Sequence, residues 1–243
     1  MKQWILMFVA YVIMVATNAL ANILPINGQT TSEISNRLDV PFTPAGYVFS
    51  IWGLIYFLLA IWLIIAFRNR NTKKAVPRKI GFLFILTCLL NASWLFSFHY
   101  EQFILSTIII VALLVTLIAI HQSYPKGENR FGGRLPFSFY LGWISVATIA
   151  NVNYTLKFHD VSLGIGEMEG TIGLVIIAGT LGIITRYRTD DPFYALVFVW
   201  AIIGIGVANS GTVLATAAYI VAAVVFISIV AGAFTRTKKA AYA

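Results

Sequence analysis

Neutral polar side chains inside apolar surroundings are the residues of this sequence best placed to do chemistry. An amide in lipid leaves donors and acceptors unpaired at a cost of several kcal/mol, so each needs a polar partner. Helix–helix hydrogen bonds and a ligand pocket both satisfy that need, and the sequence leaves both open. The residues concerned lie at similar depth: Asn18, Asn22, Asn91, Ser93, Asn151 and Asn153.

Aromatic residues accompany these amides. Phe49, Trp52 and Tyr56 are spaced i, i+3 and i+7, which predicts one face of a helix. An aromatic wall with a few neutral polar groups is typical of a site for a flat, mostly apolar ligand, although such stripes also occur in ordinary helix packing. Two further tryptophans, Trp94 and Trp143, lie near the amides, whereas Trp4, Trp62 and Trp200 are expected in the interfacial belts.

Enzyme and metal motifs are missing. The sequence contains no HExxH, CxxC, GxGxxG or P-loop pattern, and its histidines, His99, His121 and His159, follow no ligand spacing. No Asp, Glu, Lys or Arg interrupts the apolar runs, which weakens an ion-coupled transporter interpretation. We therefore expect no catalytic residue, no metal and no cofactor, and favour a binding protein over an enzyme.

The elements that must position these residues are apolar helices. The chain has 243 residues, of which 59% are hydrophobic and 11% charged. A bilayer core of about 30 Å needs about 20 helical residues, and continuous rather than alternating apolar runs exclude spanning strands. The sequence predicts an all-α polytopic membrane protein with about eight spans: Ile5–Leu24, Pro44–Phe67, Ile80–Phe98, Phe103–His121, Leu135–Leu156, Gly170–Thr185, Pro192–Ala208 and Thr212–Phe234.

Charge decides the orientation. With eight spans, most basic residues fall on one side, six of them between Arg68 and Lys79, while Arg37 and Lys157 fall on the other. The positive-inside rule predicts a multi-pass protein of the cell membrane with both termini cytoplasmic. Confinement of the +8 net charge to short loops argues against nucleic acid as a partner. A cleavable signal peptide ending near Ala21 is the alternative for the first span.

Three motifs resemble the TspO/MBR family of tryptophan-rich sensory or translocator proteins. Residues 44–56, PAGYVFSIWGLIY, are similar to the second-helix signature, with Tyr47 where the family often has tryptophan. Asn91 and Trp94 match a third-helix N-x-x-W. In the fifth helix, Trp143 and Asn151 match W-x7-N with Ala147 between them, but the family's proline four residues before the tryptophan is absent.

The resemblance covers residues 1–157 and implies a five-helix bundle there. It does not extend to residues 158–243, for which the apolar runs predict a three-helix extension. It implies a pocket closed by the long loop Pro25–Thr43, in which residues 32–37 could form a helical turn. The ligand would be a porphyrin, another tetrapyrrole or a sterol-like lipid, which the protein would bind, sense or transport. The expected ligand-binding residues are Phe49, Trp52, Tyr56, Asn91, Trp94, Trp143, Ala147 and Asn151.

Two other functions stay open: a secondary transporter of a small molecule, and an intramembrane enzyme that degrades tetrapyrroles. The expected partners are membrane lipid and the hydrophobic ligand. Small-xxx-small spacings at Ala178/Gly182 and Ala218/Ala222 favour close helix packing, within the chain or in a homodimer.

Overall fold

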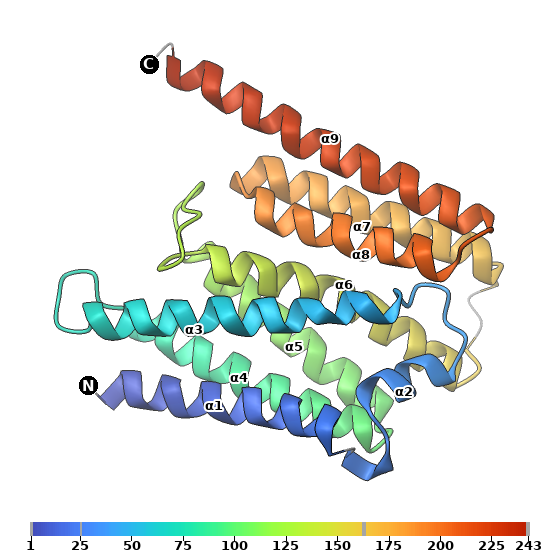
Figure 1. The fold of residues 1–243 in the computed structure, drawn as a ribbon, viewed down its shortest axis with the longest axis horizontal. Coiled ribbons are helices and arrows are strands. Elements are labelled where there is room, and N and C mark those ends of the chain that lie inside the picture. The colour runs from blue at the N-terminus through green and yellow to red at the C-terminus, as the bar shows by residue number, and fades with distance from the viewer. Residues whose placement is uncertain (1, 25, 162–163, 242–243) are drawn as a thin grey trace. The chain divides into compact units, whose positions relative to one another are not determined.

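A computed structural model describes residues 2–24, 26–161 and 164–241, without the side chains of Asn22 and of residues 235–241. Its elements run in the order α1 Lys2–Ile23, η1 Ile26–Gly28, α2 Thr31–Arg37, η2 Gly46–Ser50, α3 Ile51–Asn69, α4 Arg78–His99, α5 Phe103–Gln122, α6 Leu135–Phe158, α7 Glu167–Thr189, α8 Pro192–Ala208 and α9 Val213–Ala241 (Figure 1). Arg236, Lys238 and Lys239, on which the predicted orientation partly relies, lie outside the residues with described side chains.

The prediction of a polytopic helical membrane protein is confirmed. The described residues contain no strand, and seven helical segments are long and apolar enough to cross a membrane. The eighth, α8, is apolar throughout but has only 17 residues. The helical turn expected in the long loop is α2, whose N-terminus carries a capping box formed by Thr30 and Glu33.

Two of the predicted spans begin at a proline, Pro44 and Pro192, and only the second starts as an α-helix there. At α8, Asp191 Oδ1 accepts hydrogen bonds from the backbone N–H groups of Phe193 and Tyr194, and Pro192 takes the first helical position. After Pro44, by contrast, a 3-10 turn begins at Gly46 and α-helix only at Ile51. In this turn the Val48 N–H donates to the Ala45 carbonyl, three residues back, which is the 3-10 pattern, and the Ala45 N–H donates to the Gly204 carbonyl of α8.

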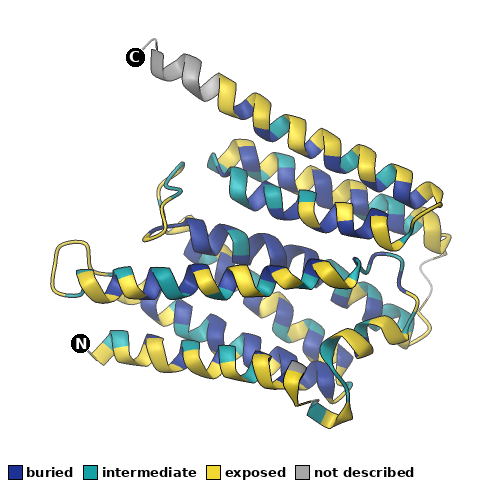
Figure 2. Cartoon of the chain, in the orientation of Figure 1, coloured by how far each residue is buried: buried dark blue, intermediate teal, exposed yellow. Residues whose placement is uncertain are grey.

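The chain forms two compact units. The first contains residues 1–40 and 51–161, with α1, α3, α4, α5 and α6 packed as a bundle in which α4 contacts both α5 and α1. Its buried residues line the interhelical faces, and exposed apolar residues cover the outside (Figure 2). The prediction that Trp62 lies in an interfacial belt is wrong: it is fully buried, because its ring packs between Phe84 and Phe137, each at 5.0 Å between centroids.

The second unit contains residues 41–50 and 162–243. Its helices α7, α8 and α9 all contact one another. Small residues allow this close packing: a Cβ at Gly179 would collide with Val221 of α9, and one at Gly182 would touch Phe198 of α8 at 3.5 Å. The small residues of α7 are therefore used inside the unit, and the homodimer stays a prediction.

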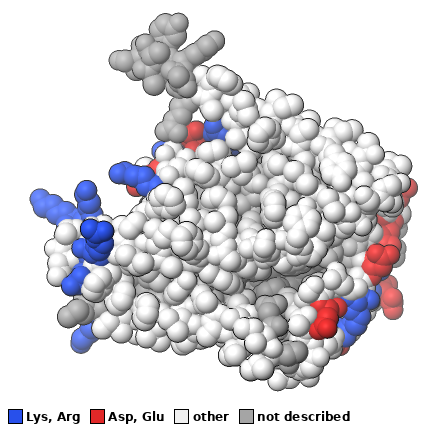
Figure 3. All heavy atoms as spheres, in the orientation of Figure 1, with Lys and Arg blue, Asp and Glu red and all other residues white. Residues whose placement is uncertain are grey.

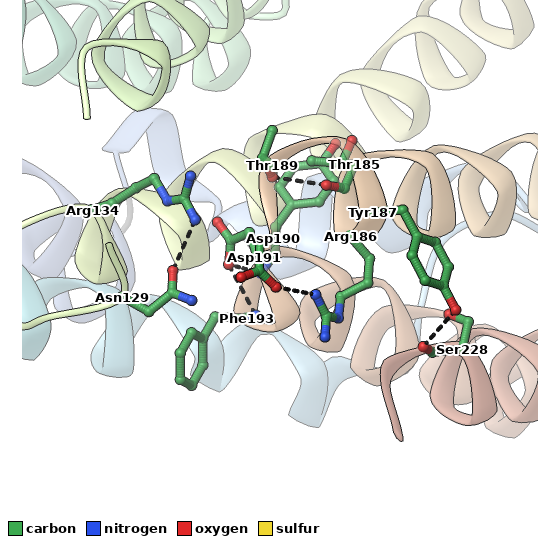
Figure 4. Close-up of polar contacts among 11 residues, drawn as sticks. Asn129, Arg134, Thr185, Arg186, Tyr187, Thr189, Asp190, Asp191, Phe193 and Ser228 are labelled. Atoms are coloured by element: carbon green, nitrogen blue, oxygen red, sulfur yellow. Dashed lines mark hydrogen bonds and ion pairs between the residues drawn. The ribbon is translucent and has the colours of Figure 1, made fainter. Parts of the chain in front are cut away.

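A buried charge pair closes the α7–α8 turn of this second unit. Arg186, 4% exposed, donates from Nη1 to Asp190 Oδ1 at 2.8 Å (Figure 4). Asp190 has left-handed backbone geometry, with a φ of 54°, which brings its carboxylate back toward Arg186. The guanidinium lies against Gly232 of α9, where a Cβ would come within 2.7 Å of Nη2. Glycine at this position therefore lets the buried arginine lie across α9.

Candidate ligand-binding site

Two asparagines of the first unit meet between α1 and α4. Asn18 Nδ2 donates to Asn91 Oδ1 at 2.7 Å and to the Met14 carbonyl at 2.9 Å. The Asn91 side chain is fully buried, and its Nδ2 makes no hydrogen bond to any residue that the structure describes. An amide donor left unpaired at this depth costs about 1–3 kcal/mol.

An aromatic cluster formed by α3 and α6 contains a second such atom. Trp52 stacks on Tyr56, with 5.5 Å between ring centroids, and meets Tyr140 and Trp143 edge to face at 6.0 and 6.2 Å. The Tyr56 hydroxyl is buried, and no described residue hydrogen-bonds to it. Tyr140 lies within hydrogen-bonding reach of the Asn91 side chain, although no bond of good geometry forms to Asn91 Nδ2. The cluster thus offers flat apolar rings together with two unpaired polar atoms.

Asn151 has a different environment. Its Oδ1 accepts from Trp94 Nε1 at 2.8 Å, and its Nδ2 donates to Thr107 Oγ1 at 2.8 Å and to Ser106 Oγ at 3.1 Å. Both ends of the amide are therefore occupied by α4 and α5. This geometry is that of a helix–helix hydrogen bond, which was one of the two interpretations left open for the amides.

The two remaining expected site residues, Ala147 and Phe49, lie on α6 and in η2. Ala147 is half-buried on α6, between the turns that carry Trp143 and Asn151. Phe49 lies in η2, within the segment 41–50 that belongs to the second unit.

The long loop after α1 is fastened to the end of α4 by His99, which is fully buried. Its Nε2 lies 2.9 Å from Thr31 Oγ1, and its Nδ1 lies 3.2 Å from the Ile26 carbonyl. Asn27 Nδ2 in turn donates to the His99 carbonyl at 3.1 Å. Both ring nitrogens are thus occupied by the loop, and no group of three His, Cys, Asp or Glu gathers in the described chain to hold a metal.

Comparison with known proteins identifies the family. A family model described as TSPO-like protein matches residues 3–231. The chain belongs to the TSPO-like protein family. No curated protein and no solved structure matches it. The family match continues past residue 157 through α7 and α8 and into α9, so the C-terminal helices belong to the matched region.

The loop of this TSPO-like protein is also tied down at its far end. Tyr154 Oη donates to the Ile34 carbonyl at 2.8 Å, and Lys157 Nζ donates to the Asp39 carbonyl. Arg37 pairs with Glu101 at 2.6 Å, and this hydrogen bond lowers the pKa of the Glu101 carboxyl. The loop is thus held over the ends of α4 and α6 by contacts from both helices.

Two tyrosines of the candidate site are absent from the sequence prediction. Tyr140 lies three residues before Trp143, on the same helical face, so its spacing could have identified it. Tyr11, whose hydroxyl donates to the Tyr56 carbonyl at 2.9 Å, gives no such signal, because its partner lies on another helix.

Proposed function

We propose that this TSPO-like protein binds a flat, mostly apolar ligand, a porphyrin or a sterol-like lipid, within its first helical unit. The observation that supports the proposal is the pair of buried, unpaired polar atoms, Asn91 Nδ2 and Tyr56 Oη, next to the rings of Trp52, Tyr140 and Trp143. A ligand oxygen could accept a hydrogen bond from either atom, and its flat body could stack on the indoles.

The aromatic rings supply affinity, and the polar atoms supply orientation. Stacking contributes about 0.5–1.5 kcal/mol per ring pair beyond the burial of apolar area. A hydroxyl or carboxyl oxygen placed at Asn91 would remove the cost of an unpaired buried donor, about 1–3 kcal/mol. Together these contributions favour a ligand that is flat, apolar over most of its surface and polar at one edge.

Titration of the purified protein with protoporphyrin, followed by porphyrin absorbance, tests the proposal. Trp52→Phe and Trp143→Phe should each weaken binding several-fold, since loss of about 1.4 kcal/mol is a tenfold change in Kd. Trp4→Phe is the control: it makes the same Trp-to-Phe change in the first turn of α1, outside the aromatic cluster, where Nε1 donates to the Leu63 carbonyl. Unchanged binding by folded Trp52 and Trp143 variants would reject this site.

The same preparation separates binding from the other candidate functions. Porphyrin absorbance that is stable in the dark and is lost only under light and oxygen would indicate chemical breakdown. Uptake of porphyrin into sealed vesicles containing the protein, compared with empty vesicles, would indicate transport. Binding without light-dependent porphyrin loss and without uptake would indicate a sensing or storage role.

We further propose that the protein lies in the cell membrane with both termini in the cytoplasm. In the first unit, the α3–α4 loop carries Arg70, Lys73 and Lys74, and the α5–α6 loop carries Lys126 and Arg130. Lys and Arg side chains gather at the end of the bundle from which the α3–α4 loop emerges, whereas the opposite end carries charges of both signs (Figure 3). The positive-inside rule assigns the basic end to the cytoplasm.

A further inference from the structure

The ten residues before α3 are held by α8, although they lie far from it in the sequence. The Ala45 N–H donates to the Gly204 carbonyl at 3.0 Å, and Asn209 Nδ2 donates to the Pro41 carbonyl at 2.9 Å. Trp200 Nε1 donates to the Val48 carbonyl at 3.1 Å. Three backbone groups of the segment 41–50 are therefore hydrogen-bonded by α8 and its C-cap residue, Asn209, in the second unit.

Side-chain packing reinforces these hydrogen bonds. The Tyr47 ring meets the Trp200 ring edge to face at 5.3 Å. Gly204 lets the segment approach, because a Cβ there would collide with Val48 Cγ2 and lie 3.2 Å from Pro44 Cβ. Val48 is fully buried, so its side chain has no free space into which to retreat. The segment 41–50 is therefore closely packed against α8 at Gly204, and one added methyl group there would disturb the packing.

This segment continues directly into the helix that carries the aromatic cluster. Residues 46–68 form one uninterrupted helical span, in which η2 passes into α3 between Ser50 and Ile51. Trp52 and Tyr56 lie in the first two turns of α3. A change in the position or rotation of Val48 is therefore transmitted through helical backbone to both aromatic side chains.

We infer that α8 is a positioning element for the ligand site: by holding residues 41–50, it sets the rotation of the α3 N-terminus and with it the orientation of Trp52 and Tyr56. The C-terminal helices thereby control the affinity of the five-helix unit for its ligand. The effect on affinity rests on the proposed function, whereas the effect on the α3 N-terminus does not.

The test uses Gly204→Ala in the full-length protein, with two comparison variants. Gly173→Ala adds the same methyl group to α7 of the same unit at a position with open space around it. The double variant Gly204→Ala/Val48→Ala adds one methyl group to α8 and removes both γ-methyl groups of Val48, including the Cγ2 that the new Cβ would meet, so it should relieve the collision. Hydrogen–deuterium exchange of residues 46–56 and protoporphyrin affinity are measured for each protein.

Gly204→Ala should speed amide exchange in residues 46–56 and weaken protoporphyrin binding about fivefold, the equivalent of one lost stacking contact. The double variant should restore both properties, and Gly173→Ala should change neither. A general loss of stability would not be reversed by Val48→Ala, itself a large-to-small change in a buried position.

Each of the other outcomes either supports or rejects the positioning role of α8. If Gly204→Ala leaves exchange unchanged, or speeds it while affinity stays the same, α8 does not position the site and the inference is rejected. If the wild-type protein binds no protoporphyrin, the proposed function fails, and exchange alone judges the positioning role: faster exchange that the double variant reverses supports it, and unchanged exchange rejects it.

Discussion

Replacing Asn91 with leucine tests whether its amide binds the ligand or only stabilises the fold. The Asn91 side chain makes one hydrogen bond, from Asn18 Nδ2 to its Oδ1, and keeps one unpaired donor, its Nδ2. Leucine is close in size and has no polar atom. Asn18 Nδ2 keeps its second bond, to the Met14 carbonyl, but the N–H that it directs at Asn91 Oδ1 loses its acceptor.

The two effects on stability oppose each other. Loss of one interhelical hydrogen bond in a membrane costs about 0.6 kcal/mol on average and about 1.7 kcal/mol at most. Removal of an unpaired buried donor gains about 1–3 kcal/mol. The two effects nearly cancel, so the ligand-free Asn91→Leu protein should have the stability of wild type to within about 1 kcal/mol, yet bind protoporphyrin more weakly, since the polar group that orients the ligand is gone.

Asn151→Leu is the matched control, because the same change there removes three interhelical hydrogen bonds, to Trp94, Ser106 and Thr107. At about 0.6–1.7 kcal/mol each, their loss should destabilise the protein by about 2–5 kcal/mol. Unfolding in detergent gives the stabilities, and porphyrin absorbance gives the affinities. If Asn91→Leu destabilises the protein as Asn151→Leu does and binds porphyrin normally, Asn91 is a packing residue and our assignment is wrong.

Two further predictions concern the membrane and the loop. With the lone Cys88 replaced by alanine, a cysteine at Asn71 in intact cells should be protected from membrane-impermeant reagents and one at Ser32 should react; the reverse pattern would invert the whole topology. The Arg37 hydrogen bond lowers the pKa of the Glu101 carboxyl from its usual 4.5. The ion pair therefore stabilises the loop above pH 4.5, and this stabilisation is lost as the pH falls through the lowered pKa. After correction for the intrinsic pH dependence of exchange, amide exchange of residues 30–39 should therefore rise as the pH falls through the lowered pKa of Glu101, and Glu101→Gln should raise it already at neutral pH. An unchanged Glu101→Gln profile would show that the pair does not hold the loop.

The sequence alone was sufficient to predict the helices and their environment. A spanning segment must satisfy its own backbone hydrogen bonds, so long apolar runs such as Phe103–His121 have few alternatives to a helix, and α5 spans Phe103–Gln122. Motifs of four to thirteen residues likewise indicated the family, because each depends on residue types at fixed spacing within one helix.

Only the tertiary structure distinguished the amides and showed which residues α8 contacts. Asn91 and Asn151 look equivalent in the sequence, yet one keeps an unpaired donor and the other is fully bonded, since pairing depends on helix rotation and on side chains from other helices. Trp200 and Val48 are 152 residues apart, and no spacing rule connects them. Their hydrogen bond exists because folding brings α8 beside the start of the family's signature helix, a relation that lies between segments rather than within any one of them.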